Sequence, residues 1–231
     1  MNDFRENFTA FLQQQLELYG DDAICEASSL RKEPFAEKDA SPAAGAATLA
    51  ELHQSIEDCQ RCALGRTRTR LVFGSGKPQA EIVLVGEAPG AEEDRAGVPF
   101  VGRAGALLTK ILASVQIKRE DVYICNILKC RPPQNRDPLP EEIALCKPYL
   151  FAQLQLIRPK IIVCLGRVAA QVLLETTDSL SKLRGQWHGW NGIDVMVTYH
   201  PAALLRNPGY KRETWEDMKG LQQRRHSTLK R

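Results

Sequence analysis

Four cysteines have the spacing of a metal site. Cys59 and Cys62 form a CxxC motif among polar and basic residues, and Cys130 and Cys146 are separated by 15 residues that include four prolines. A CxxC loop presents two thiolates to one metal, and two distant cysteines complete a four-thiolate set. The spacing leaves three interpretations open: a Zn²⁺ ion, an iron–sulfur cluster, or a redox-active CxxC beside two unrelated thiols.

A second group of candidate residues follows short apolar runs directly. Glu87 and Glu93 follow one such run, Asn126 lies at the end of a second, and His200 follows a third. Carboxylates, amides and imidazoles bind polar ligands and move protons. If the runs are parallel strands, their carboxyl ends meet at one edge of a sheet, where ligands bind. We therefore expect these side chains to share one site.

The elements that must position these residues form an α/β pattern. Strands are predicted at 81–85, 122–128, 160–165 and 193–199. Helices are predicted at 49–57, 104–115, 141–156, 167–174 and 211–223. Apolar strands that alternate with helices predict a parallel sheet covered on both faces. The fold class is therefore α/β, with three α/β/α layers around a central, mainly parallel four-stranded sheet.

The segment 86–108, between the first strand and its helix, has an unusual composition. It contains five glycines, two prolines and four acidic residues. Glycine lets the backbone approach a ligand closely. The segment is not a phosphate-binding Walker A loop, because no Gly-Lys-Ser/Thr follows, and it lacks the GxGxxG spacing of a dinucleotide site.

Composition excludes several classes of protein. Hydrophobic residues make up 43% of the 231 residues and charged residues 26%, which is typical of a globular protein and not of a disordered chain or coiled coil. No apolar run approaches the roughly 20 residues that span a bilayer. No basic segment followed by an apolar one opens the sequence, and the cysteines are odd in number, so we expect a cytoplasmic protein without disulfides.

Charge divides the chain near residue 48. Residues 1–48 carry nine acidic and four basic side chains, whereas residues 49–231 carry 19 and 27. Apolar spacing over 3–18 predicts a helix, and the Ala- and Pro-rich stretch 31–48 predicts a linker. We therefore predict an acidic helix and flexible linker over 1–48, and one domain over 49–231 whose basic charge suits a polyanionic partner.

The sequence resembles the family 4 uracil-DNA glycosylases, which carry an iron–sulfur cluster. The matching motifs are, in order, Gly86-Glu-Ala-Pro-Gly90 with Glu93-Asp94, Pro99-Phe-Val-Gly102, Asn126 before Lys129-Cys-Arg-Pro-Pro133, and His200-Pro201. The resemblance covers about residues 49–220. It implies a uracil-DNA glycosylase-like fold and a [4Fe–4S] cluster, with zinc less favoured, on the ligands Cys59, Cys62, Cys130 and Cys146.

The resemblance also implies the residues that bind the base. Phe100 would stack on uracil, and Asn126 would pair with its O4 and N3–H, which cytosine cannot match. Glu93 would lie near C5 and reject the methyl group of thymine. Gly86 and Ala88 would line the pocket beside the base.

Two residues would act on the glycosidic bond. His200 would donate a hydrogen bond to uracil O2 and stabilise the negative charge that develops on the leaving base. Glu87 would hold the attacking water or the sugar, and its carboxylate would stabilise a cationic sugar. The alternative for Glu87 and for Glu93 is that the glutamate caps the following helix.

A DNA-binding loop is implied by His200-Pro-Ala-Ala-Leu-Leu-Arg206. Leu204 or Leu205 would fill the gap that the extruded base leaves, and Arg206 would contact a phosphate. Further phosphate contacts are expected from Arg66, Arg68, Arg70, Lys211 and Arg212.

These implications predict a monofunctional DNA repair enzyme. It would flip uracil out of single- or double-stranded DNA, hydrolyse the N-glycosidic bond and leave an abasic site for base excision repair. We expect a monomer in the cytoplasm of a bacterial or archaeal cell, associated with the nucleoid, in which residues 1–48 offer a docking segment for a protein partner. The alternative from another class is a non-catalytic nucleic-acid-binding module with a structural zinc site.

Overall fold

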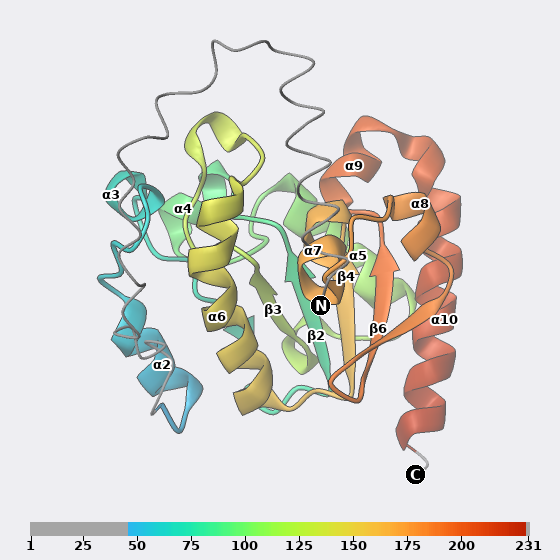
Figure 1. Cartoon of the computed structure of the whole chain (residues 1–231). Coiled ribbons are helices and arrows are strands. Elements are labelled where there is room, and N and C mark those ends of the chain that lie inside the picture. The colour runs from blue at the N-terminus through green and yellow to red at the C-terminus, as the bar shows by residue number, and fades with distance from the viewer. Residues whose placement is uncertain (1–45, 230–231) are drawn as a thin grey trace, which may run out of the picture. The chain divides into compact units, whose positions relative to one another are not determined.

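The computed structural model describes residues 46–229, and a six-stranded sheet lies at their centre (Figure 1). The strand order is β1-β3-β2-β4-β6-β5. The strands are β1 (Ser75–Gly76), β2 (Ile82–Gly86), β3 (Tyr123–Asn126), β4 (Ile161–Leu165), β5 (Trp187–Trp190) and β6 (Ile193–Thr198).

The four central strands, β3, β2, β4 and β6, are parallel and correspond to the four predicted strands. Every residue of β2, β3 and β4 is buried, which explains why these segments are continuous apolar runs. Gly86 pairs with Asn126 in register, so the ends of β2 and β3 lie side by side.

The prediction of only four strands was wrong, because an antiparallel strand lies at each edge of the sheet. Strand β1 has two residues, too few to produce a pattern, and β5 is a half-exposed Trp-His-Gly-Trp segment without alternation. The turn Asn191-Gly192, with positive φ at both residues, joins β5 to β6. Asn-Gly is the usual sequence of such a two-residue hairpin turn, so this signal was available in the sequence.

Helices flank the sheet, and the five predicted helices are confirmed, although the last of them continues to Leu229, beyond its predicted end at residue 223. They are α2 (Leu49–Ile56), α3 (Leu64–Thr67), α4 (Ala91–Ala96), α5 (Arg103–Ser114), α6 (Pro140–Ile157), α7 (Arg167–Leu174), α8 (Leu180–Leu183), α9 (Pro201–Arg206) and α10 (Lys211–Leu229). The short helices α3, α4 and α8 were not predicted, because one or two helical turns produce no periodic pattern.

Two apolar cores, one on each face of the sheet, make the three layers. Val83 and Val85 of β2 point to the face covered by α2, α6 and α7. Ile82 and Leu84 point to the opposite face, which α5 and α10 cover. The alternation of side chains along one strand therefore supplies both cores, as expected for a sheet with helices on each side.

The predicted N-terminal helix and most of the predicted linker fall on residues 1–45, which lie outside the described part of the chain. Within residues 46–229, no helix combines the length and the apolar character that crossing a membrane requires.

Candidate active site

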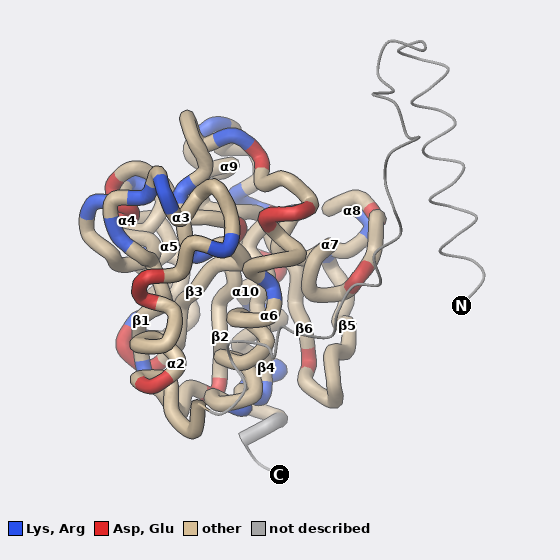
Figure 2. Tube along the Cα trace, turned by 60° about the vertical axis from the view of Figure 1, so that its left-hand side comes forward, with Lys and Arg blue, Asp and Glu red and all other residues tan. Residues whose placement is uncertain are grey.

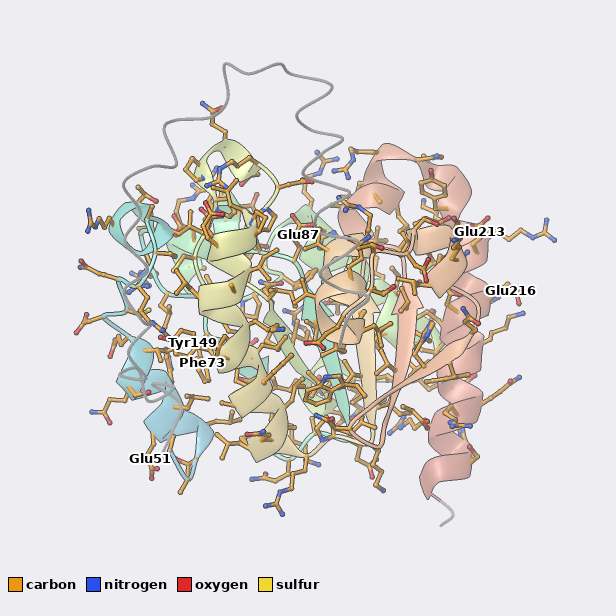
Figure 3. The ribbon with its side chains drawn as sticks, viewed as in Figure 1. Glu51, Phe73, Glu87, Tyr149, Glu213 and Glu216 are labelled. Carbon is orange, nitrogen blue, oxygen red and sulfur yellow. The ribbon has the colours of Figure 1, made fainter. Side chains whose placement is uncertain are left out.

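A cavity of about 510 Å³ opens at the carboxyl ends of the parallel strands. The loops that follow β2, β3, β4 and β6 all contribute side chains to it, so the structure brings together the residues singled out after the strands. Figure 3 shows Glu87 at this end of the sheet. The lining includes Glu87, Ala88, Glu93, Phe100, Asn126, His200 and Arg206.

Asn126 supplies an unpaired acceptor to this cavity. The residue ends β3 and is only 1% exposed. Its Oδ1 is the one buried side-chain oxygen or nitrogen in the described residues that has no hydrogen-bond partner. Leaving such an atom unpaired costs about 1–3 kcal/mol. The amide is therefore set up for a ligand that donates a hydrogen bond.

The space beside Asn126 depends on Gly86. A Cβ atom at Gly86 would lie 2.3 Å from Asn126 Oδ1 and 2.8 Å from Phe100 Cζ. Phe100 itself has a left-handed backbone with a φ of 53°. Gly105 makes room for that conformation, since a Cβ there would lie 1.8 Å from the Phe100 carbonyl oxygen. Two glycines thus hold open a flat slot between the amide and the phenyl ring.

The local fold sets the tautomer of His200. The residue caps the N-terminus of α9, and its Nδ1 accepts a hydrogen bond of 3.1 Å from the Ala202 backbone N–H. A backbone N–H can only donate, so Nδ1 carries no proton and the neutral ring carries its proton on Nε2. The His200 and Phe100 rings lie 5.3 Å apart, so the imidazole borders the same slot.

Burial keeps His200 neutral. Desolvation is the largest cause that lowers the pKa of its imidazole, the positive charge of Arg206 lowers it as well, and Glu93 opposes both, which leaves the pKa at about 4. Since the shift places the pKa below the usual 6.5, the ring is uncharged at neutral pH. The cavity therefore contains a neutral hydrogen-bond donor at a fixed position.

Glu87 is a partly buried carboxylate that lines the cavity. Burial raises the pKa of Glu87 and the nearby Asp137 raises it further, whereas Arg167 and Arg206 lower it. A carboxylate with a raised pKa, beside an open cavity, suits the acceptance of a proton from water.

Glu93 uses its carboxylate to hold the backbone. Its Oε2 accepts a hydrogen bond of 3.1 Å from the Gly90 N–H, and its Oε1 accepts two of 3.0 Å from the N–H groups of Val101 and Gly102. The capping alternative thus has a direct structural basis, and Glu93 ties the N-terminus of α4 to the residues that directly follow Phe100. Its role against the thymine methyl stays a prediction.

The two leucines of the predicted DNA-binding loop differ in exposure. Leu204 is 2% exposed and belongs to the interior, whereas Leu205 on the other side of α9 is 41% exposed. A buried core residue is not available to enter DNA without unfolding α9. Leu205 is therefore the candidate wedge, and the adjoining Arg206 is exposed at the rim of the cavity.

The four cysteines of the proposed metal site line a second, small cavity. It has a volume of about 20 Å³ and lies between the loop before α3, the β3–α6 connection and α6. Tyr149, labelled in Figure 3, forms part of its wall. Residues that are up to 87 positions apart in the sequence (Cys59 and Cys146) thus meet at one place.

Hydrogen-bond donors surround these sulfurs. Arg68 Nη1 donates to Cys130 Sγ over 3.2 Å, and the Lys129 backbone N–H donates to Cys146 Sγ over 3.4 Å. The hydroxyl of Tyr149 lies 3.4 Å from Cys59 Sγ. Donors of this kind stabilise metal-bound thiolates, so the cavity fits a group held by four cysteines.

Those same contacts change the expectation for Arg68. Its guanidinium also donates to the backbone carbonyl of Cys59, over 3.0 Å, so it faces the cysteine loop and not a DNA phosphate. Other Lys and Arg residues gather around α3, α4 and α9, at the end of the sheet where the strands meet the cavity (Figure 2). Arg66 and Arg70 are exposed within that region.

Sequence reasoning missed Arg167 at the rim of the cavity. Arg167 begins α7 and forms an ion pair of 3.3 Å with Asp137 from the proline-rich loop. Arg136 anchors the same loop through Glu142, over 2.6 Å. The sequence did contain a signal, because Arg167 lies just after β4. Ligands bind at the carboxyl ends of parallel strands, so a polar residue just after β4 is a candidate for the site, as are those after β2, β3 and β6.

The comparisons with known proteins agree with this architecture. Residues 73–219 match the family described as the Uracil DNA glycosylase superfamily, and this is the class that the fold and the cavity define. A type-4 uracil-DNA glycosylase of Archaeoglobus fulgidus is 48% identical over 182 residues, which cover 75% of this chain and 92% of that protein. One of Thermotoga maritima is 49% identical over 156 residues, which cover 67% and 81%. The chain belongs to the type-4 uracil-DNA glycosylase family.

Membership confirms the predicted family, fold class and enzyme class: the protein is a hydrolase of N-glycosyl bonds that acts in DNA repair. It does not favour the non-catalytic module with structural zinc.

Proposed function

We propose that this chain binds deoxyuridine flipped out of DNA in the cavity at the strand ends and hydrolyses its N-glycosidic bond there. One observation carries this proposal: two groups border the same slot. They are the unsatisfied amide oxygen of Asn126, which can accept a hydrogen bond, and the fixed donor on His200. Flipping costs a few kcal/mol, and contacts to the edge of the base offset that cost.

Asn126 selects the base. Its Oδ1 accepts the N3–H of uracil, and its amide nitrogen donates to O4. Cytosine has an unprotonated N3 and an amino group at these positions, so both contacts would be mismatched. The unpaired state of Oδ1 in the free protein supports this role, since binding uracil satisfies it.

His200 and Glu87 assist bond cleavage. As the bond to the sugar breaks, negative charge develops on the base, and the Nε2–H of His200 stabilises it at O2. Glu87 accepts a hydrogen bond from the attacking water and offsets the positive charge of the sugar. No lysine is among the described residues that line the cavity, so we expect hydrolysis without strand cleavage.

The test of the function is incubation of the protein with a single-uracil oligonucleotide, followed by alkali. We expect a strand break at the uracil only after alkali, and none in the same oligonucleotide with thymine or cytosine. The variant that combines Asn126→Ala with His200→Ala serves as the control. Equal release of uracil by this variant would contradict the assignment of the site.

Replacing Gly86 by alanine is expected to lower kcat/KM on uracil-containing DNA at least 100-fold. The added methyl group would meet two fixed groups, the amide of Asn126 at 2.3 Å and the ring of Phe100 at 2.8 Å, and would fill the slot. Steady-state kinetics measures the effect. Gly189→Ala, where nothing lies within 4 Å of the added Cβ, is the matched control and should retain activity.

We further propose that Cys59, Cys62, Cys130 and Cys146 hold a [4Fe–4S] cluster. Four thiols line one small cavity and hydrogen-bond donors surround their sulfurs, which supports a group held by four thiolates. Membership of the type-4 family favours an iron–sulfur cluster over zinc. The cluster, when bound, supplies structural cross-linking through iron–thiolate bonds.

Replacing Cys130 by alanine is expected to lower the melting temperature by about 10 °C, since the loss of a cross-link worth several kcal/mol shifts Tm by about 2–4 °C per kcal/mol. Broad visible absorbance and iron content should fall, and soluble yield with them. Cys164→Ala, at a buried cysteine outside the set, should keep both iron and colour. A colourless wild-type protein that contains zinc would overturn the cluster.

The DNA-binding surface follows from the exposed side of α9. Leu205 would fill the vacated position in the stack and Arg206 would contact a phosphate. We also propose that the protein acts as a monomer on single- or double-stranded DNA in the cytoplasm, near the nucleoid. Residues 1–48 remain the proposed docking segment for a protein partner.

A further inference from the structure

A lysine and a glutamine lie buried together beneath the end of β3. Lys129 is 1% exposed and Gln153 on α6 is 0% exposed. Neither lines the cavity that holds Asn126. Lysine is almost never buried so completely unless its ammonium group is paired. The groups to which Lys129 and Gln153 hydrogen-bond therefore indicate the function of the two residues.

The ammonium group of Lys129 holds the backbone of Asn126. Lys129 Nζ donates to the Asn126 carbonyl oxygen over 2.7 Å and to Gln153 Oε1 over 2.6 Å. Gln153 Nε2 in turn donates to the Phe73 carbonyl oxygen over 2.9 Å. The contacts form a chain from α6 to the last residue of β3, and every bond in it is buried and short.

This anchor completes the fixing of the peptide that follows Asn126. Gly86 and Asn126 are the last registered pair of β2 and β3, and the Ile127 N–H of that peptide donates to the Gly86 carbonyl oxygen over 2.9 Å. Lys129 holds the carbonyl oxygen of the same peptide. Asn126 Oδ1 lies 2.3 Å from the position that a Cβ on Gly86 would occupy, so a small movement changes its place in the slot. A rotation of the Asn126 peptide would move Oδ1 into the slot or away from it. The bond from Lys129 opposes that rotation.

The burial of an ammonium group argues for a positioning function. Apolar side chains of similar volume often fill such a site with equal or better stability. The backbone at Lys129 also contributes to the cavity of the four cysteines, because the Lys129 N–H donates to Cys146 Sγ and Cys130 is the next residue. The segment 127–130 and helix α6 thus carry both the cysteines and the anchor of Asn126.

We propose that Lys129, supported by Gln153, is a positioning residue that aligns the Asn126 amide with the edge of uracil and thereby sets the preference for uracil over cytosine. This inference rests on the proposed role of Asn126 as the reader of the base. It assigns no contact between Lys129 and the substrate.

The test is Lys129→Met in the full chain. Since a misplacement of about 1 Å in a site can cost about 100-fold in rate, we expect kcat/KM on uracil-containing DNA to fall about 10- to 100-fold. Free uracil, used as a product inhibitor, should bind at least 10-fold more weakly. The ratio of uracil to cytosine excision should fall, whereas iron content should not change.

Leu221→Ala separates positioning from stability. The change lies in the core between α10 and the sheet, so it should lower stability without changing the affinity for uracil. Unchanged uracil affinity in Lys129→Met, or an equal loss of uracil affinity in Leu221→Ala, would overturn the inference.

Asn126→Ala in the same assays distinguishes this inference from the proposed function. If Asn126→Ala loses uracil binding and Lys129→Met keeps it, the inference fails and the function stands. If Asn126→Ala itself binds uracil normally, the assignment of the site fails.

Discussion

Replacing His200 by alanine is expected to lower kcat about 100- to 1,000-fold, the usual loss when one donor to a developing negative charge is removed. KM should change little, because the bond to O2 strengthens only as the base departs. Single-turnover kinetics on a uracil oligonucleotide measures this directly. His226→Ala, on the exposed side of α10, is the matched control and should retain wild-type activity.

The pH dependence gives an independent check on the same residue. With the pKa of His200 lowered to about 4, the rate should show no step near pH 6.5, where an ordinary histidine titrates. Between about pH 6.5 and 4 the unfolded chain binds a proton at His200 that the folded chain does not. Stability should therefore decrease as pH falls through this range, and part of the decrease should disappear in His200→Ala. A rate that follows a group of pKa 6.5 would contradict the neutral imidazole.

Replacing Asn126 by alanine is expected to lower kcat/KM about 1,000-fold, since two hydrogen bonds to a base that gains charge are each worth about 1.5–3 kcal/mol. The selectivity between uracil and cytosine should fall with it, because the amide is the only described group that we assign to reading O4 and N3–H. Competition between the two oligonucleotides measures the selectivity.

The control for Asn126→Ala is Asn191→Gly. Asn191 lies in the β5–β6 turn with a φ of 48°, a conformation that glycine adopts without strain, so activity and fold should both persist. Full retention of uracil selectivity by Asn126→Ala would mean that another group reads the base.

The location of the candidate site could be predicted because the sequence shows where each parallel strand ends. The apolar runs before Glu87, Asn126 and His200 predicted parallel strands, and parallel strands bring their carboxyl ends together. Motifs in the resemblance then assigned chemistry to these positions. The core of the sheet was equally predictable, since buried parallel strands are continuous apolar runs.

The direction of individual side chains was not predictable. Leu204 and Leu205 are adjacent and equally apolar, and only the rotation of about 100° per residue along α9 separates a core residue from an exposed one. The triple hydrogen bond of Glu93 depends on how the loop at 97–102 folds back. The anchor from Lys129 depends on Gln153, which is 24 residues away in the sequence.

One imidazole joins two tasks in this fold. The Nδ1 atom of His200 caps α9, the helix that presents Leu205 and Arg206, and the charge of Arg206 also disfavours protonation of the ring. In the proposed mechanism, the helix that docks on DNA and the donor to the leaving base are therefore held together by one hydrogen bond. A DNA site that displaces α9 would also tilt the imidazole, so the fit of the DNA backbone would affect the rate at which the base is released.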